Sequence, residues 1–466
     1  MEKQRKNIPA RPFGLRDKLG YLFGDFGNDF TFVLSSSFLL KFYTDVMGVE
    51  GYVVGIVMMV ARFVDAFTDV AMGRICDRSR QTPVGKFKPW IRRMCGPVAI
   101  SSFLIYQSSL ANMGMTFKII WLFVTYILWG SIFYTSINIP YGSMASAISP
   151  EPEDRQSLST YRTLGGTLAG VVIGAGVPIL AYDQVEGNAV MNGPRFTIIA
   201  GIFSLLAVGS YLLCYYLTTE RVKPKDNPEQ HQKYSVLDML RNALKNRALI
   251  SIIVASIVML LAQLTMQSMA NYIYPNFYGN TAAQSASTIV MMVGMFIAAA
   301  VSKGLARRFG KAEISVVSNL LAAVVCFLLY FLRPGNVWVY VALTGLNWIG
   351  LGVFSMVSWA LITDVIDYSE LKNGIREDGS VYALYSFARK LGQAASAGLT
   401  GALISAIGYS RETAFDTGVV NALFDISTLI PALGFAALAA ILWFWYPLHK
   451  RQVEENVAAL KKKHES

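Results

Sequence analysis

Several charged side chains in this 466-residue sequence lie inside long apolar segments, and the most informative are two aspartates. Asp65 and Asp69 are four residues apart, so they share one face of a helix, and Thr68 lies beside them. Two carboxylates and a hydroxyl are suitable ligands for a hard monovalent cation, and two carboxylates that repel each other also make a proton carrier. The structural alternative is a packing ion pair between Arg62 and Asp65. Since one arginine cannot neutralise two aspartates, we favour cation binding.

Lys390 is a second charge that needs an explanation. An ionisable group near the centre of a bilayer costs at least about 2.5 kcal/mol, so it is expected to have a function. If Lys390 faces the cavity, Asp65 and Asp69 are its natural partners, and its competition with a cation for them would couple two binding events. The alternative is that the side chain extends to the cytoplasmic surface. Arg389 points in a different direction around the helix, and the sequence assigns it no role.

A polar stripe marks the segment SIFYTSINIPYGSMASA (131–147). Tyr134 and Asn138 share a helix face, and Thr135 lies next to them. An aromatic ring, a hydroxyl and an amide together suit a sugar ring. Polar contacts between helices explain the same pattern equally well.

The composition predicts which elements carry these groups. The chain is 54% apolar and only 15% charged, against roughly 25% charged in a soluble domain. Its four cysteines have no CxxC spacing and its three histidines lie in polar segments, so neither a metal site nor a haem site is expected. A membrane helix needs about 20 apolar residues. Twelve segments qualify: 19–47, 51–75, 93–112, 117–147, 159–182, 196–218, 248–276, 284–304, 312–332, 336–363, 381–407 and 421–446.

Polar segments divide the chain and orient it. Lys and Arg gather in alternate loops, so the positive-inside rule places both termini in the cytoplasm. The net charge of +11 is therefore an orientation signal, and nucleic acid is not an expected partner. The expected parts are a cytoplasmic arm (1–18), an N-terminal six-helix bundle (19–218), a cytoplasmic linker (219–247), a C-terminal six-helix bundle (248–448) and a cytoplasmic tail (449–466).

Five motifs together resemble one family. They are GDFGNDF (24–30), VARFVDAFTDVAMGRICD (60–77), GKFKPW (85–90), NIPYGSM (138–144) and ITDVIDYSE (362–370). The sequence resembles the glycoside–pentoside–hexuronide:cation symporters of the major facilitator superfamily, which include the melibiose permease. That resemblance implies an all-α membrane protein of the bacterial inner membrane, with two six-helix bundles and alternating access around a central sugar site.

The resemblance also implies roles for individual residues. Asn28, Asn138 and Gly142 depart from the melibiose permease pattern; the last two resemble the glucuronide and xyloside branches and suit an anionic glycoside or a neutral pentoside. The expected cation site is Asp65, Asp69, Thr68 and Thr135; the expected sugar site is Asp29, Tyr134, Asn138, Arg162, Ser386 and Lys390; and the expected cytoplasmic gate is Asp77, Arg78 and Lys86.

The predicted function is symport of a sugar with a cation, H⁺ being favoured over Na⁺. An uncoupled facilitator and a sugar-binding membrane sensor are the alternatives. A channel would need a symmetric ring of charges, and an enzyme would need a nucleophile and base or a metal, so both are less favoured. We expect no cofactor besides the coupling ion, a small-molecule sugar and membrane lipid as partners, and a functional monomer.

Overall fold

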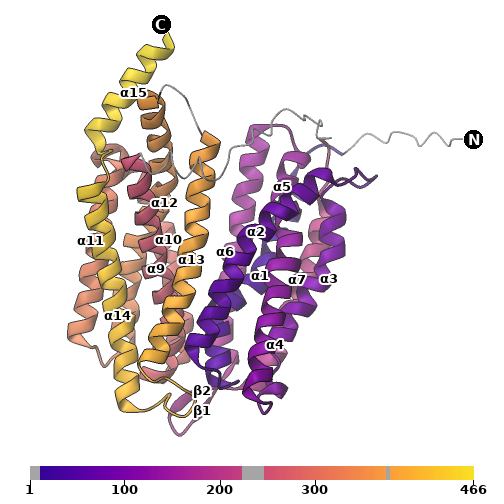
Figure 1. Ribbon diagram of the computed structural model, residues 1–466, viewed down its shortest axis with the longest axis vertical. Coiled ribbons are helices and arrows are strands. Elements are labelled where there is room, and N and C mark those ends of the chain that lie inside the picture. Colours follow the sequence, from indigo (N-terminus) through magenta and orange to yellow (C-terminus); the bar gives the residue numbers. More distant parts are fainter. Residues whose placement is uncertain (1–10, 223–245, 374–377, 466) are drawn as a thin grey trace, which may run out of the picture.

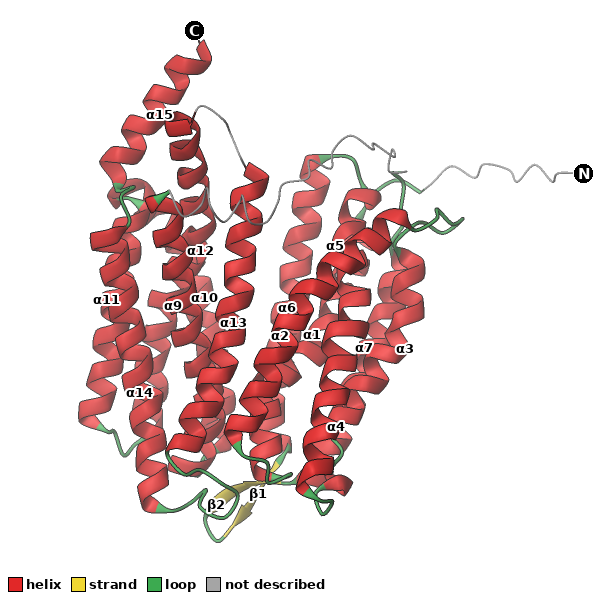
Figure 2. Ribbon diagram, in the orientation of Figure 1, coloured by secondary structure: helices red, strands yellow, loops and turns green. Residues whose placement is uncertain are grey.

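The computed structural model describes residues 11–222, 246–373 and 378–465, and it is almost entirely helical (Figures 1 and 2). The N-terminal bundle consists of α1 (Leu15–Asp45), α2 (Gly51–Arg78), α3 (Lys88–Ile105), α4 (Met115–Ile127), the π-helical η2 (Leu128–Tyr134), α5 (Thr135–Ile148), α6 (Pro152–Leu180) and α7 (Gly193–Leu217). The C-terminal bundle consists of α9 (Arg247–Tyr272), η4 (Ile273–Phe277), α10 (Thr281–Phe309), α11 (Lys311–Leu332), α12 (Val337–Asn373), α13 (Asp378–Ala406), α14 (Thr417–Ala440) and η5 (Ile441–Trp445).

Apolar length explains most of these helices. In the described parts of the chain, eight helical segments are long and apolar enough to cross a membrane. The other four of similar length, α1, α2, α3 and α13, carry several charged residues, which lower their hydropathy. The predicted all-α membrane fold is confirmed. Most of the predicted linker and more than half of the predicted N-terminal arm lie outside the described residues.

Two local details go beyond the predicted segments. The third segment was expected at 93–112, but α3 spans Lys88–Ile105 and is followed by the short 3-10 helix η1 (Ser108–Leu110). The side-chain amide of Gln107 donates to the carbonyl of Phe103 at the end of α3, which favours termination there. Between α6 and α7 the chain forms an antiparallel hairpin of β1 (Tyr182–Val185) and β2 (Asn188–Met191). Glu186 and Gly187 both have positive φ, 52° and 83°, as a two-residue hairpin turn requires.

The hairpin provides a reference for the two ends of the molecule. We call the end where β1 and β2 lie the hairpin end, and the opposite end, where α1 begins and α15 (Lys450–Glu465) lies, the terminal end (Figure 1). The bundles touch at the hairpin end. There α2 packs along α13, and α6 along α10. A Cβ added to Gly401 of α13 would lie 2.8 Å from the Cα of Gly55 in α2, so glycine is needed for this close approach.

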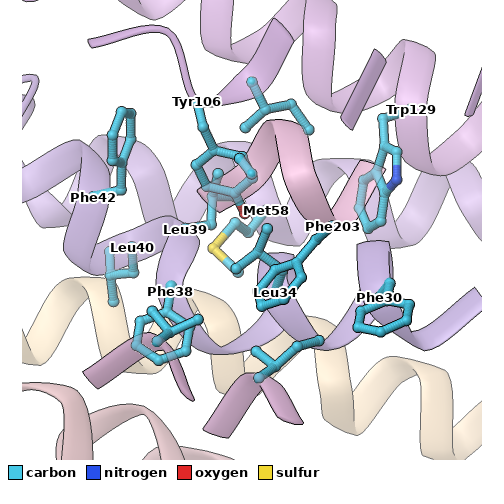
Figure 3. Packing of buried hydrophobic residues seen from close by; sticks show 14 of the residues in the cluster. Phe30, Leu34, Phe38, Leu39, Leu40, Phe42, Met58, Tyr106, Trp129 and Phe203 are labelled. Carbon is cyan, nitrogen blue, oxygen red and sulfur yellow. The ribbon is translucent and has the colours of Figure 1, made fainter. Parts of the chain in front are cut away.

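The buried apolar residues form two clusters that differ in extent. The larger runs through the N-terminal bundle and continues into the C-terminal bundle at the hairpin end, through residues such as Tyr272 and Ile404. The second lies wholly in the C-terminal bundle. In the larger cluster, four α1 residues spaced four apart form one stripe, packed near Met58, Tyr106, Trp129 and Phe203 (Figure 3): Phe30, Leu34, Phe38 and Phe42.

Candidate functional site

The two α2 aspartates each meet a hydroxyl from the neighbouring helix. Ser131 Oγ donates to Asp65 Oδ1 at 2.5 Å, and Thr135 Oγ1 donates to Asp69 Oδ1 at 3.0 Å. The two aspartates are four residues apart, and so are the two residues with hydroxyl groups. One turn of α2 therefore lies beside one turn of the neighbouring helix. Ser131 lies within η2 and Thr135 directly follows it; such π-helical turns occur often at functional sites. The arrangement concentrates four oxygen-bearing side chains between α2 and α5.

Each aspartate also has a cationic partner, and the two partners come from different bundles. Arg62 Nη1 lies 3.4 Å from Asp65 Oδ2 on the same helix, and the guanidinium stacks over the ring of Phe32 at 4.9 Å. Lys390 of α13 donates to Asp69 Oδ2 across the bundle interface. The sequence offered both aspartates as partners of Lys390, whereas within the described parts of the chain its ion pair is with Asp69 only. The Lys390 side chain is 41% exposed, so this pair is accessible.

Thr68 does not join this arrangement. Its hydroxyl donates to the carbonyl oxygens of Val64 and Asp65 in its own helix. Such a local bond is common for threonine in helices. Ser131 therefore occupies the place beside Asp65 that the sequence had given to Thr68.

The predicted arginine of α6 pairs with an aspartate of α1. Arg162 Nε lies 3.0 Å from Asp25 Oδ1, and the guanidinium lies over the ring of Tyr141 at 5.2 Å. A Cβ added to Gly142 would be 3.7 Å from Arg162 Nη1, which is an ordinary van der Waals distance, so Gly142 lies next to the guanidinium. Within the described residues, the carboxylate of Asp29, one turn from Asp25, has no hydrogen bond or ion pair.

A chain of hydrogen bonds fixes the amide of Asn138. The hydroxyl of Tyr211 donates to Asn28 Oδ1 at 2.8 Å, and Asn28 Nδ2 donates to Asn138 Oδ1 at 3.3 Å. The oxygen of Asn138 is thus engaged, while its NH₂ group makes no hydrogen bond with the described residues. Asn138 therefore presents donors.

Tyr134 connects the two groups of residues. Its ring stacks against Phe32 with centroids 5.6 Å apart, and Trp129 lies at the same distance on a tilted plane. Because the guanidinium of Arg62 lies over Phe32, this aromatic layer packs against the arginine that pairs with Asp65. The ring of Tyr134 is thus packed against protein, which limits the area left for stacking a sugar.

The remaining predicted residues lie toward the terminal end. Ser386 is exposed on α13, one turn before Lys390. Arg78, at the end of α2, is also exposed. The backbone N–H of Lys86 donates to Glu220 Oε2 at 2.6 Å, which anchors the loop between α2 and α3. The side chain of Asp77 lies outside the described part of the structure.

Comparison with known proteins agrees with this architecture. A family model described as MFS/sugar transport protein matches residues 20–450. The chain belongs to that family. It is a transporter and not an enzyme, and the predicted resemblance to the melibiose permease-like symporters is confirmed.

The relatives of this transporter differ in the substrates for which they are named. It is 29% identical to the uncharacterized symporter YjmB of Bacillus subtilis, with 96% of each chain covered. It is 30% identical to a putative sulfoquinovose importer of Salmonella typhimurium (96% and 93% covered) and 28% identical to the isoprimeverose transporter of Lactiplantibacillus pentosus (96% and 91%). A bacterial homologue of the lysosomal transporter Spinster, solved inward-facing and unoccupied, has the same fold, with a TM-score of 0.66, 12% identity and coverage of 95% and 97%.

A second charged cluster of the transporter, at the hairpin end, was missed from the sequence. Lys41 Nζ lies 2.7 Å from Asp45 Oδ2 on the same helix and donates across the bundle interface to Asn276 Oδ1 (2.6 Å) and the Tyr409 hydroxyl (2.7 Å). It also lies over the ring of Tyr272 at 4.4 Å. The Lys41 side chain is only 1% exposed. The i, i+4 spacing of a lysine and an aspartate in the last turns of an apolar segment was the available signal.

Two other roles became visible only in the folded transporter. Ser131 and Thr135 are four residues apart, as are the two aspartates. The sequence contains this match, but it has a meaning only once the two helices are known to pack together. Arg389 stacks over Trp359 and Tyr385, with its guanidinium carbon 5.8 and 5.9 Å from the two ring centroids. It faces an aromatic pair, while its neighbour Lys390 faces the aspartates.

Proposed function

We propose that this transporter is a sugar:cation symporter of the bacterial inner membrane that works by alternating access, with H⁺ as the coupling ion. Both termini are then cytoplasmic, because the arginine- and lysine-rich loops lie at the terminal end. Arg78 and Lys86 would take part in closing that end. The cation is bound by Asp65 and Asp69, and sugar binds beside Asp29, Asn138 and Arg162.

The ion pair between Lys390 and Asp69 is the observation that carries this proposal. It joins α13 of one bundle to α2 of the other, and its lysine is partly exposed. A cation on the aspartates weakens the attraction that holds Lys390, so cation binding changes the energy of the contact between the bundles. Linkage then requires sugar and cation to strengthen each other's binding by the same factor.

Two features favour a proton over Na⁺. Each aspartate is already bonded to one cation and one hydroxyl, so a proton on Asp69 needs no other group to move except Lys390. Sodium would need several of these oxygens to converge on one point. The two hydroxyls of Ser131 and Thr135 are the observation that favours Na⁺, since they complete a set of oxygen ligands with the carboxylates.

The test is a titration of sugar affinity against pH, with and without Na⁺ at constant ionic strength. The sugar is first chosen by counterflow in proteoliposomes with a panel of xylosides, glucuronides and galactosides. For H⁺, affinity falls as the pH rises and Na⁺ has no effect at fixed pH. For Na⁺, affinity rises with its concentration. Affinity indifferent to both ions would leave an uncoupled facilitator or a sensor.

A further inference from the structure

A polar cavity lies at the terminal end of the C-terminal bundle, away from the sites between the bundles. It measures about 140 Å³, which is enough for several water molecules or one small polar group. Its walls come from the end of α10, the start of α11, α12, and α15, the helix at that end in Figure 1. Charged side chains of both signs line it: Arg307, Lys311, Asp364, Lys450 and Glu454. None of them belongs to the proposed sugar site or cation site.

The docking of α15 shapes this cavity. The backbone N–H of Lys450 donates to Glu313 Oε1 at 2.8 Å, and Lys450 Nζ donates to the carbonyl of Arg308 at 2.9 Å. Gly310, between α10 and α11, has a φ of 103°, and an added Cβ would lie 2.9 Å from the Cβ of Lys450. Glycine is therefore needed where α15 approaches this turn. Since hydrogen bonds and close packing hold α15 in place, the cavity is preformed.

One wall of the cavity has an acceptor without a donor. Asp364 is only 6% exposed, and its Oδ1 atom accepts from Lys311 Nζ at 2.6 Å. Its Oδ2 atom is buried and, within the described parts of the chain, accepts no hydrogen bond. A carboxylate oxygen in that position favours a ligand with an N–H or O–H donor. An ammonium suits it best, because a hydrogen bond between two charged groups is stronger than one between neutral groups.

A free cation lines the same cavity. Arg307 is exposed in the last turn of α10, and none of the described residues forms a hydrogen bond or an ion pair with its side chain. Its planar guanidinium matches two oxygens of a phosphate. Lys450 adds a second positive charge, because its ammonium lies 4.0 Å from the exposed carboxylate of Glu454, and such an exposed pair is weak. The cavity thus offers cations for a phosphate and a carboxylate oxygen for an ammonium.

The surroundings place the cavity at the level of a membrane interface. Leu305 and Phe309, on the same helix as Arg307, are both exposed. After α14, Trp443 is exposed, and its ring lies 5.7 Å from that of His449, the residue before Lys450. Exposed apolar side chains, tryptophan and basic residues occur together where hydrocarbon meets lipid headgroups. The ligand is therefore more readily a lipid headgroup than a free solute.

We propose that this cavity binds the headgroup of a zwitterionic phospholipid with a primary ammonium, as in phosphatidylethanolamine. The phosphate binds Arg307 and Lys450, and the ammonium donates to Asp364 Oδ2. The lipid then braces α10, α11, α12 and α15 within one bundle. It takes no part in binding sugar or the coupling ion, so this site is independent of the proposed symport.

The experiment measures lipid binding to the purified full-length protein in detergent by native mass spectrometry. Four lipids with the same acyl chains are compared: phosphatidylethanolamine, its N,N-dimethyl derivative, phosphatidylcholine and phosphatidylglycerol. Phosphatidylcholine keeps the phosphate and the positive charge but has no N–H donor, so it should bind about tenfold or more weakly than phosphatidylethanolamine, the scale of a hydrogen bond to a charged group. The dimethyl lipid keeps one N–H and should bind more tightly than phosphatidylcholine. Phosphatidylcholine or phosphatidylglycerol binding as tightly as phosphatidylethanolamine would overturn the inference.

Two substitutions locate the headgroup. Arg307→Gln should weaken binding of phosphatidylethanolamine and phosphatidylcholine alike, because both carry the phosphate. Asp364→Asn should remove the preference between them, because the acceptor of the ammonium loses its charge. Arg308→Gln is the matched control and should change neither, since the guanidinium of Arg308 lies over the ring of Phe309 at 5.2 Å and does not line the cavity.

Arg307→Gln decides the test if Asp364→Asn, which loses the ion pair with Lys311, fails to fold. Arg307 has no partner to lose among the described residues, and a melting curve for each variant checks its fold. Unchanged lipid binding by a folded Arg307→Gln variant would contradict the assignment, and so would an equal loss in Arg308→Gln.

Free phosphoethanolamine separates the two sources of this headgroup chemistry. It carries the same phosphate and ammonium without acyl chains, so it should displace the lipid only at far higher concentrations. Displacement at concentrations similar to those of the lipid would overturn the assignment to a phospholipid.

Discussion

Two charged clusters join the bundles of this transporter, and they differ in how far solvent reaches them. At the hairpin end, Lys41 is 1% exposed and contacts Asp45, Asn276 and Tyr409 within one hydrogen-bonded group. Nearer the terminal end, Lys390 is 41% exposed and pairs with Asp69, which is 23% exposed. A buried charge needs every partner that it has, whereas an accessible one can exchange its partner for water or an ion.

That difference assigns the clusters different tasks. The buried cluster sits where the apolar core is continuous between the bundles, so it holds the hairpin end closed. The accessible cluster sits where a cation can reach the carboxylates. The conformation described here is therefore the one closed at the hairpin end. Opening that end requires the Lys41 contacts to the other bundle to break. In the proposed symport, binding of the coupling ion requires the Lys390 contact to break.

The largest expected effect comes from breaking the accessible cluster. Asp69→Asn and Lys390→Ala should each abolish accumulation of sugar against its gradient while leaving counterflow, because the groups that couple ion to sugar are lost and the pathway is not. The measurement is uptake into proteoliposomes with an imposed pH gradient, paired with counterflow in the same vesicles. Lys303→Ala, at an exposed lysine of α10, is the control. Full uphill transport by both variants would place coupling elsewhere.

The next effect comes from breaking the buried cluster. Lys41→Met should favour opening at the hairpin end, because the lysine's bonds to Asn276 and Tyr409 are lost and Asp45 loses its ion-pair partner. Removing one member of a buried pair costs about 3–5 kcal/mol, and even about 1.4 kcal/mol of it changes the open population tenfold. The rate of thiol labelling at a Ser285→Cys reporter measures this opening, because Ser285 is buried where α10 meets α6. The described native cysteines are buried and should contribute little labelling.

Lys118→Met provides the matched control for that experiment. Lys118 is also a buried lysine, but it donates to the carbonyls of Met47 and Ala111 in its own bundle. Its loss should lower stability without increasing labelling of the reporter. Equal labelling in the two variants would mean that general loosening, and not release of the bundle interface, explains the Lys41 result.

Loss of a contact that lies inside one bundle should lower stability without opening the hairpin end, which makes it a reference for the two clusters between the bundles. Glu220 accepts the backbone N–H groups of Lys86, Phe87 and Lys88 at the start of α3, at 2.6–2.9 Å. Glu220→Ala leaves these donors without their acceptor and should cost about 1–3 kcal/mol. Thermal unfolding measures the loss, and labelling of the Ser285→Cys reporter should not change. Glu153→Ala, at an exposed glutamate of α6, is the control.

Glu220 also predicts a pH dependence. Burial raises the pKa of this carboxyl above its ordinary value, against the opposing effect of the three N–H groups. The folded protein therefore holds this proton more tightly than the unfolded chain, so the contribution to stability is full below the ordinary pKa and is lost as the pH rises through the raised pKa. Glu220→Gln cannot ionise. The wild type should therefore lose melting temperature relative to this variant as the pH rises through that window, and parallel curves would contradict the prediction.

The smallest effect concerns the neighbour of Lys390. Arg389→Gln removes the stacking on Trp359 and Tyr385 and should cost about 0.5–1 kcal/mol of stability. Accumulation of sugar should stay coupled, because Arg389 faces the aromatic pair and not the aspartates. Thermal unfolding and gradient-driven uptake test the two parts. Loss of coupling would show that both basic residues belong to the accessible cluster.

The sequence by itself determined the membrane-spanning helices and the most informative charges. Apolar length is a local property, so the helices followed from it, except where the chain turned early after α3 and paired β1 with β2. Asp65, Asp69 and Lys390 stood out because charge inside an apolar segment is costly wherever the segment lies. The family motifs added Asp29, Asn138 and Arg162.

Only the tertiary structure decided the partners. Hydrogen bonds and ion pairs depend on distances of a few ångströms between helices far apart in sequence, and no local pattern contains those distances. For that reason Ser131 replaced Thr68 beside Asp65, Asp25 emerged as the partner of Arg162, and Lys41 was found joined to Asn276 and Tyr409 of the other bundle. Charge could be recognised along the chain, but whether it is buried, balanced or free to bind was fixed by how the two bundles pack together.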